Sequence, residues 1–96
     1  MKSILIIGLG RFGRHLCRKF MSLNNEVMIV DRDEAAVTAL ADEVTSAQIA
    51  DCTDENALRA LGVKNFDLCF VCIGSDFASS LLITSMLKDM GAARVV

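Results

Sequence analysis

The sequence predicts an α/β fold in which short strands alternate with helices to build one parallel sheet. Short apolar runs recur along the chain, and each is followed by apolar residues spaced three or four apart, as on one face of a helix. Unbroken apolar runs are typical of strands buried on both faces, and the alternation favours parallel strands with right-handed crossovers. We therefore expect one domain over residues 1–96: a Rossmann-like, doubly wound sheet with strand order 3-2-1-4-5.

The first half of the chain contains the clearest elements. Residues 3–7 and 27–30 form apolar runs and are predicted to be the first two strands. The helix between them carries a stripe of large apolar residues that should face the core: Phe12, Leu16, Phe20 and Leu23. Asn24 and Asn25 are expected to end this helix.

The next elements are shorter. Asp33 is the expected N-cap of a second helix, and a third strand is predicted near residues 47–50. A brief third helix follows, which either Thr53 or Asp54 can cap, and Gly62 is its expected stop.

The last third of the chain repeats the pattern. Residues 68–72 are predicted to form the fourth strand, and Asp76 to cap a helix over residues 77–90 that Gly91 terminates. Residues 94–96 should begin a fifth strand. A doubly wound domain continues beyond that point, so we expect this chain to be the N-terminal part of a longer polypeptide, truncated at strand five.

The strongest functional signal is a glycine-rich loop at residues 8–13, which matches G-x-G-x-x-G. The loop follows a buried strand and opens an amphipathic helix, which is the context that nucleotide binding requires. Gly8 permits the tight turn, Gly10 lets the backbone approach a pyrophosphate, and Gly13 allows close packing of helix on strand. The unpaired amides at the helix N-terminus supply donors and a partial positive charge.

An acid at the end of the second strand completes the pattern. Asp31 can accept hydrogen bonds from both ribose hydroxyls, and its charge disfavours a 2′-phosphate, which favours NAD(H) or ATP/ADP over NADP. Arg32 weakens the argument against a 2′-phosphate, because its guanidinium could donate hydrogen bonds to such a phosphate or stack on adenine.

Two later groups of residues should reach the same edge of the sheet. They are Asp51, Cys52 and Thr53 after the third strand, and Ile73, Gly74 and Ser75 after the fourth. The first group could meet the adenine, although helix capping explains Thr53 nearly as well. The second should face the phosphates or a second ribose, although Gly74 could equally be a turn residue.

Two residues inside the glycine loop have separate expectations. Arg11 could reach the phosphates as a charged donor. Phe12 is expected to pack in the core as the first core-facing residue of the helix, with its backbone amide serving the ligand. His15, one turn further on, is expected to face solvent.

The remaining composition narrows the class of function. A net charge of −2 argues against a nucleic-acid partner. The sequence contains no run of about 18 apolar residues, so no membrane span is expected. Four cysteines without a signal peptide suggest reduced thiols in the cytoplasm. Cys69 and Cys72 form C-x-x-C, but this spacing in a strand places them on opposite faces, so no metal site is expected.

The sequence has one histidine and no evident pair of nucleophile and base. We therefore expect a site that binds a nucleotide without reacting with it, and we do not expect the protein to be an enzyme. The alternative is the cofactor-binding half of an NAD-dependent dehydrogenase whose catalytic residues lie elsewhere, and a third possibility is a structural domain with an inactive site.

Four motifs together resemble the KTN/RCK (TrkA-N) family, the nucleotide-sensing regulatory subunits of potassium transporters and channels. They are I-I-G-L-G-R-F-G at residues 6–13, V-D-R-D at 30–33, A-D-C-T-D at 50–54 and C-I-G-S-D at 72–76. The Arg-Phe pair within the glycine loop looks most like the regulators of Ktr/Trk-type potassium uptake.

The resemblance implies a cytoplasmic regulatory subunit at the inner face of the membrane, which gates ion flux by changing shape when NAD(H) or ATP/ADP binds. It also implies a homo-oligomer, a dimer or an octameric ring, docked on a membrane-embedded potassium transporter subunit. Its site residues would be Gly8, Gly10, Arg11 and Gly13 at the phosphates, Asp31 at the ribose, and Arg32, Asp51 and Cys52 around the adenine. The wide apolar face predicted for residues 77–90 would suit subunit contact, although a following helix and strand could cover it.

Overall fold

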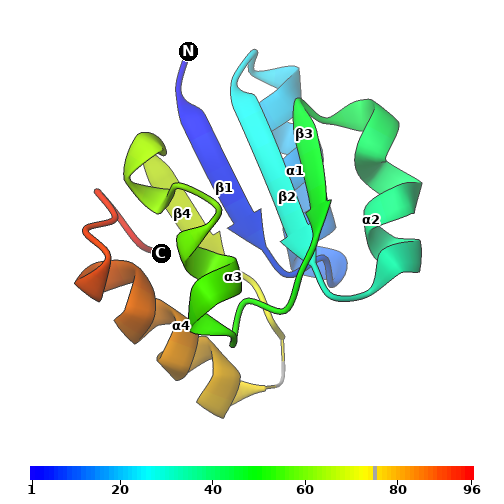
Figure 1. Cartoon of the computed structure of the whole chain (residues 1–96). Coiled ribbons are helices and arrows are strands. Elements are labelled where there is room, and N and C mark those ends of the chain that lie inside the picture. Colours follow the sequence, from blue (N-terminus) through cyan, green and yellow to red (C-terminus); the bar gives the residue numbers. More distant parts are fainter. Residues whose placement is uncertain (75) are drawn as a thin grey trace.

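A computed structural model describes residues 1–74 and 76–96 and shows a parallel sheet with helices on both faces (Figure 1). Ser75 lies outside the described residues, and so does the prediction made for it. The sheet has four strands in the order β3-β2-β1-β4. They are β1 (Ser3–Ile7), β2 (Glu26–Asp31), β3 (Ser46–Ile49) and β4 (Leu68–Val71).

The pairing of the strands confirms the doubly wound arrangement for these four. Ile6 of β1 is the parallel partner of Ile29 in β2 on one side and of Phe70 in β4 on the other. The chain therefore adds β2 and β3 on one side of β1 and then crosses to place β4 on the other side. This reversal beside β1 is the switch point at which parallel sheets of this kind open a crevice.

Residues 94–96, the predicted start of a fifth strand, pair with β4 but are not a full strand of the sheet. Val95 makes a single isolated bridge to Cys69, and the Cys69 amide donates to the Arg94 carbonyl oxygen over 2.8 Å. The Val96 amide also donates to the Cys69 carbonyl oxygen over 2.9 Å, and the Val71 amide donates to the Val96 carbonyl oxygen over 3.1 Å. The last residues therefore align in parallel with β4 without forming a complete strand, and Val96 is 61% exposed. The strand order 3-2-1-4 is thus confirmed, whereas the fifth position is not.

The helices cover the two faces in pairs. They are α1 (Arg11–Ser22), α2 (Glu34–Leu40), α3 (Glu55–Arg59) and α4 (Phe77–Asp89). One hydrophobic cluster joins Cys17 of α1 and Val37 of α2 to the Ile4 and Ile6 face of the sheet. A second cluster joins the other pair of helices to the opposite face: Leu58, Ile83 and Leu87 with Leu5, Ile7 and Val30. Side chains alternate across a strand, so every central strand contributes to both clusters.

The rotation of α1 about its axis differs from the prediction. Phe12 is 64% exposed, and Leu23 is 57% exposed and lies just beyond the helix. The buried positions of α1 are Gly13 and Cys17, with Leu16 partly buried beside them. The prediction that Phe12 packs in the core is therefore wrong, because the close approach of Gly13 to the strand turns its large neighbour toward solvent.

Three helices begin at an aspartate whose side chain accepts from a backbone amide of the first turn, as predicted. The pairs are Asp33 with Ala35, Asp54 with Asn56, and Asp76 with Ser79. Of the two possible caps for α3, the structure therefore has Asp54. Each carboxylate satisfies a donor that the helix leaves unpaired and complements the helix dipole.

Cys69 and Cys72 lie on opposite faces, as predicted. Cys69 packs in the cluster that contains α4, and Cys72 in the cluster that contains α1. All four cysteines are free and buried, and the part of the chain that the structure describes contains no cluster of three metal-ligating side chains. Within the same residues, no helix combines the length and apolarity needed to span a membrane.

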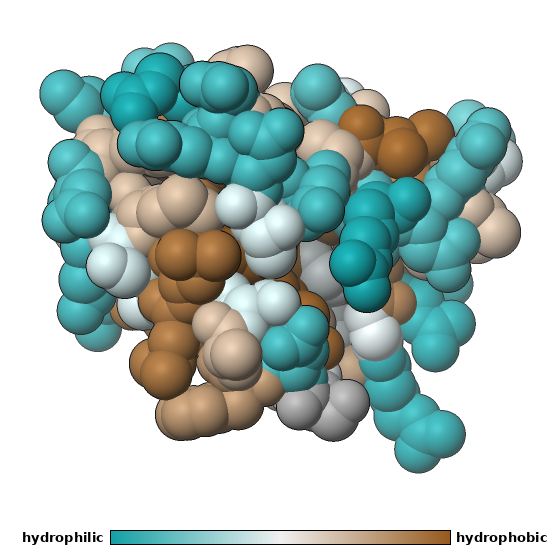
Figure 2. Space-filling view, turned by 60° about the horizontal axis from the view of Figure 1, so that its bottom comes forward, coloured by the Kyte–Doolittle hydropathy of each residue, from teal (hydrophilic) through white to brown (hydrophobic). Residues whose placement is uncertain are grey.

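The outer surface of α4 is unusually apolar. Phe77 is 73% exposed, Leu81 55% and Leu82 48%, while Ile83 and Leu87 on the inner side are buried. Figure 2 looks toward the lower end of the molecule in Figure 1 and shows apolar side chains gathered at that surface. The wide apolar face predicted for this helix is confirmed as exposed in this chain.

Candidate functional site

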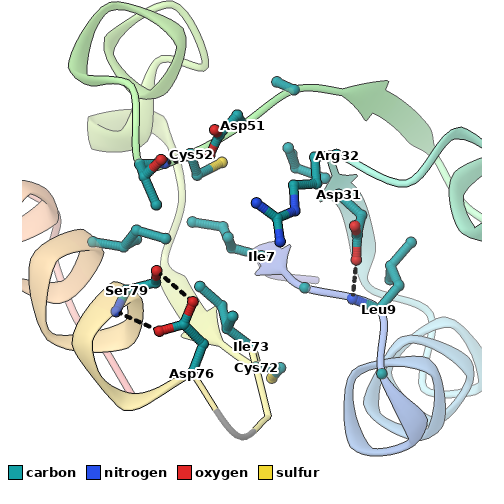
Figure 3. A pocket seen from close by; sticks show the side chains of 16 residues that line it. Ile7, Leu9, Asp31, Arg32, Asp51, Cys52, Cys72, Ile73, Asp76 and Ser79 are labelled. Atoms are coloured by element: carbon teal, nitrogen blue, oxygen red, sulfur yellow. Dashed lines mark hydrogen bonds between the residues drawn. The ribbon is translucent and has the colours of Figure 1, made fainter.

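A cavity of about 320 Å³ opens at the carboxyl ends of the strands (Figure 3). Its floor is formed by the ends of β1 and β2, and its walls by the glycine loop, the loop after β3 and the start of α4. This is the switch point of the sheet, where the strand order reverses beside β1. The topology therefore places the glycine loop and the ends of the neighbouring strands around one space.

The outer glycines of the loop fix its shape. Gly8 has a φ of 100°, which L side chains rarely adopt, and a Cβ there would overlap the Cys72 carbonyl oxygen. A Cβ on Gly13 would overlap the Gly8 carbonyl oxygen. Gly8 and Gly13 thus allow β1, β4 and α1 to approach closely, as predicted.

Gly10 is different, because it leaves a space open. A Cβ built there would meet nothing within 4 Å, and the backbone has an ordinary extended conformation at φ −66° and ψ −173°. Gly10 lines the cavity at the N-cap of α1. A Cβ at this position is compatible with the fold, but a side chain would occupy space next to the helix terminus.

The N-terminus of α1 is open to the cavity. Within the described chain, no side chain caps this helix, and its first turn contains no acidic residue. The first amides of a helix have no partner within the helix, and together with the dipole they attract an anion. The arrangement can hold a phosphate group by backbone donors alone.

Asp31 has a structural role that the sequence did not reveal. One of its carboxylate oxygens accepts from the Leu9 amide over 2.7 Å, and the other from the Asp33 amide over 2.9 Å. The side chain therefore ties the glycine loop to the end of β2. Each carboxylate oxygen can accept more than one hydrogen bond, so this role is compatible with contact to a ribose.

The opposite side of the cavity carries two further carboxylates, each bound by a hydroxyl. The Thr53 hydroxyl donates to Asp51 over 2.6 Å, and the Ser79 hydroxyl donates to Asp76 over 2.7 Å. These hydrogen bonds, with those from the amides of the same two residues, hold the pKa of both carboxyls below the usual value, and the charge of Arg32 acts in the same direction. Both groups are therefore ionised at neutral pH.

Arg32 lies between these carboxylates and the end of β2. Its side chain extends into the space between Asp31 and Asp51 in Figure 3. It is the one basic side chain among the described residues that line the cavity. The prediction that Arg32 reaches the site is thus supported by its position.

Cys52 lines the cavity from the loop after β3 but is only 5% exposed. Burial, with the nearby carboxylates of Asp51 and Asp31, raises the pKa of its thiol to about 11. The thiol stays protonated at neutral pH, so it contributes a small apolar surface and no nucleophile.

Most of the predicted site residues come together. Those that line the cavity are Gly8, Gly10, Asp31, Arg32, Asp51, Cys52, Thr53 and Ile73. Arg11, Phe12, Gly13 and Gly74 do not line it. Gly13 acts through packing, whereas the exposed Arg11 and Phe12 project from α1, and Gly74 occupies an exposed turn with a φ of 73°.

Two polar residues of the wall were missed as site residues. Asp76 was predicted only as a helix cap, and Ser79 was not singled out, yet both face the cavity from the start of α4 (Figure 3). A signal was present in the sequence: α4 begins soon after β4 ends, so its first turn must lie at the carboxyl edge of the sheet.

The fold and the position of the cavity place this chain in the class of domains with the Rossmann nucleotide-binding fold. Comparison with known families gives the more particular assignment, because the TrkA-N domain matches residues 4–96. The chain belongs to this family, which confirms the resemblance found in its four motifs.

Similar proteins agree with this assignment. The chain is 42% identical over 89 residues to Ktr system potassium uptake protein A of Bacillus subtilis (strain 168), covering 93% of this chain and 40% of that protein. It therefore spans about two-fifths of the length of that curated relative.

Two solved structures share the fold. The NAD(P)-binding domain of an exopolyphosphatase-related protein from Archaeoglobus fulgidus has a TM-score of 0.79 and 25% identity, covering 100% of this chain and 87% of that one. The Kef C-terminal domain of Shewanella denitrificans in its AMP-bound form has a TM-score of 0.79 and 21% identity, covering 97% of this chain and 56% of that one.

Proposed function

We propose that this chain is the nucleotide-binding domain of a regulator of potassium uptake, and that its cavity binds NAD(H) or ATP/ADP. The observation that carries the proposal is the open N-terminus of α1, which lies next to Asp31 at the switch point of the sheet. Backbone amides there suit a phosphate, and the carboxylate suits the hydroxyls of a ribose.

The comparisons support the same ligand class. One structural neighbour is described as an NAD(P)-binding domain and another as bound to AMP, so adenine nucleotides occupy this fold in other proteins. NAD(H), ADP and ATP all contain adenosine followed by phosphate. A site for that shared part accounts for either ligand pair.

Two observations support the regulatory role: the name of a relative and the chemistry of the cavity. The curated relative is named as a potassium uptake protein. The described lining of the cavity holds carboxylates and one guanidinium, with a thiol that stays protonated, which suits binding and supplies no evident catalytic pair. A bound nucleotide then regulates uptake through its different affinity for two conformations of the protein.

We infer that the protein works at the cytoplasmic side of the membrane, docked on an integral potassium transporter subunit and assembled with copies of itself. The exposed apolar residues of α4, Phe77, Leu81 and Leu82, suit such an assembly. Light scattering of the isolated protein and its copurification with the membrane subunit test this part. The rival role as the cofactor-binding half of a dehydrogenase requires catalytic residues outside this chain, so a catalytic domain with a paired His or Lys in the same polypeptide would favour that role.

Calorimetric titration with NADH, ADP and ATP tests the binding site, with Gly10→Val as the decisive variant. We expect the wild-type protein to bind these ligands and the variant to lose at least about tenfold in affinity, or about 1.4 kcal/mol. The Cβ of the valine would meet no atom within 4 Å, so the side chain would enter the open space at the start of α1.

Ala39→Val provides the matched control, since it adds the same side chain at an exposed position of α2 outside the cavity. The control should bind as the wild type does. Unchanged binding by Gly10→Val would remove the glycine loop from the site. No binding of any of the three ligands at millimolar concentration would favour a structural domain with an inactive site.

A further inference from the structure

The wall of the cavity opposite the glycine loop ends in a helix N-terminus that is already occupied by a carboxylate. Asp76 accepts from the Ser79 amide over 3.0 Å and from the Ser79 hydroxyl over 2.7 Å at the start of α4. Both residues line the cavity and lie together in Figure 3. The cavity is therefore bordered by two helix starts of opposite electrostatic character, one open and one filled by an anion.

The charges around this wall are mainly negative. The ionisable side chains of the described lining, cysteines aside, are the carboxylates of Asp31, Asp51 and Asp76 and the guanidinium of Arg32. The guanidinium of Arg32 is near enough to lower the pKa of both Asp51 and Asp76, but the lining still carries three carboxylates against this one cation. A further anionic group placed beside Asp76 would meet the like charge of this carboxylate in a lining with an excess of negative charge.

The candidate ligands differ in the group that reaches this wall. ADP ends at its second phosphate, whereas ATP adds a third phosphate and NAD(H) adds a second ribose at the same point. A phosphate brings negative charge and only acceptors. A ribose brings hydroxyl donors, which a carboxylate accepts as charge-assisted hydrogen bonds.

We propose that Asp76 is a specificity-determining residue that makes this cavity favour a dinucleotide over a nucleoside triphosphate, by accepting from ribose hydroxyls where a third phosphate would be repelled. The inference rests on the proposed function and concerns the same cavity. It assigns the ligand's second half to the wall formed by Asp76 and Ser79, and its adenosine half to the side of Asp31.

Asp76→Asn tests the inference, because asparagine keeps an oxygen that can cap α4 but removes the charge. Dissociation constants for ADP, ATP and NADH are measured by calorimetry for the wild type and the variant. We expect the affinity for ATP relative to ADP to rise about threefold to tenfold in the variant, the scale of one exposed charge, while that of NADH relative to ADP falls. Asp76→Ser, a second neutral cap, should shift both ratios in the same directions.

Asp54→Asn is the matched control, since Asp54 caps α3 in the same way but does not line the cavity. In this control, the affinities for ATP and NADH relative to ADP should stay as in the wild type. Ratios in Asp76→Asn and Asp76→Ser that stay within about twofold of the wild type, or that move equally in Asp54→Asn, would overturn the inference. If ADP still binds and Gly10→Val abolishes that binding, the proposed function survives this result. If no ADP binding occurs at all, both fail.

Discussion

The starts of α1 and α4 face the same cavity but are built in opposite ways. The N-cap of helix α1 is Gly10, and within the described residues no side chain caps this helix. Helix α4 begins at Asp76, whose carboxylate accepts from both the amide and the hydroxyl of Ser79. The open terminus attracts an anion, and the capped terminus repels one. The two helices are of similar length, so the difference in their caps alone gives two borders of one cavity opposite electrostatic character.

The largest effect is expected where α1 is held in place. In Gly13→Ala the new methyl group would overlap the Gly8 carbonyl oxygen, so α1 must shift away from β1. We expect a net loss of about 2 kcal/mol or more in the free energy of unfolding, because overpacking outweighs the helix propensity gained from alanine. Urea denaturation measures this loss.

Gly10→Ala is the matched control in the same loop, since its methyl group meets no atom within 4 Å. Its free energy of unfolding should change by less than about 1 kcal/mol. Equal losses in the two variants would show that the packing of Gly13 on Gly8 does not position α1.

A substitution can give the start of α1 the same kind of cap that α4 has. Gly10→Asp introduces a capping carboxylate at the open terminus, which should leave the fold as stable or slightly stabilise it. The affinity for ADP should fall by about 1–3 kcal/mol, because the carboxylate takes the amides and repels the phosphates. Gly10→Asn introduces a neutral cap and should lose less affinity for ADP than Gly10→Asp. If aspartate and asparagine had the same effect, charge would not explain the difference between the two helices.

The smallest effect concerns the cap of α4 and its dependence on pH. The hydrogen bonds from Ser79 hold the pKa of Asp76 below its value in the unfolded chain. A lowered pKa stabilises the fold fully above the unfolded-state value, and this stabilisation is lost as the pH falls through the folded-state value. Asp76→Ala should therefore be less stable than the wild type at neutral pH.

The difference in stability between Asp76→Ala and the wild type should shrink in acid. Urea midpoints of both proteins across the acidic range provide the measurement. A difference that stays constant into strong acid would mean that the charge of Asp76 does not stabilise α4.

Much of the fold could be predicted because its signals are local. Apolar runs marked three of the four strands, the third strand was predicted near residues 47–50, and Asp33 and Asp76 were identified as caps from their place before helical patterns. The separation of Cys69 from Cys72 followed from the alternation of side chains along a strand. The fifth strand could not be decided in this way, because pairing at residues 94–96 depends on alignment with β4.

The rotation of α1 shows where a local pattern was insufficient. Phe12, Leu16 and Phe20 have helical spacing, and so do Gly13 and Cys17 one residue further on. Large apolar residues suggested the first stripe, but the contact between Gly13 and Gly8 determines which side of the helix faces the sheet. Phe12 is exposed as a consequence.

The sequence by itself determined the order of elements, the glycine loop and the aspartate that follows the second strand, since each depends on residues close together in the chain. Only the tertiary structure decided which of these residues share a cavity. It brought Asp76 and Ser79 to the same cavity as the glycine loop, left Arg11 and Gly74 outside, and gave Asp31 the Leu9 amide as a partner. The physical reason is that a cavity at a switch point is assembled from the ends of separate strands, whose relative positions are set by packing on both faces of the sheet.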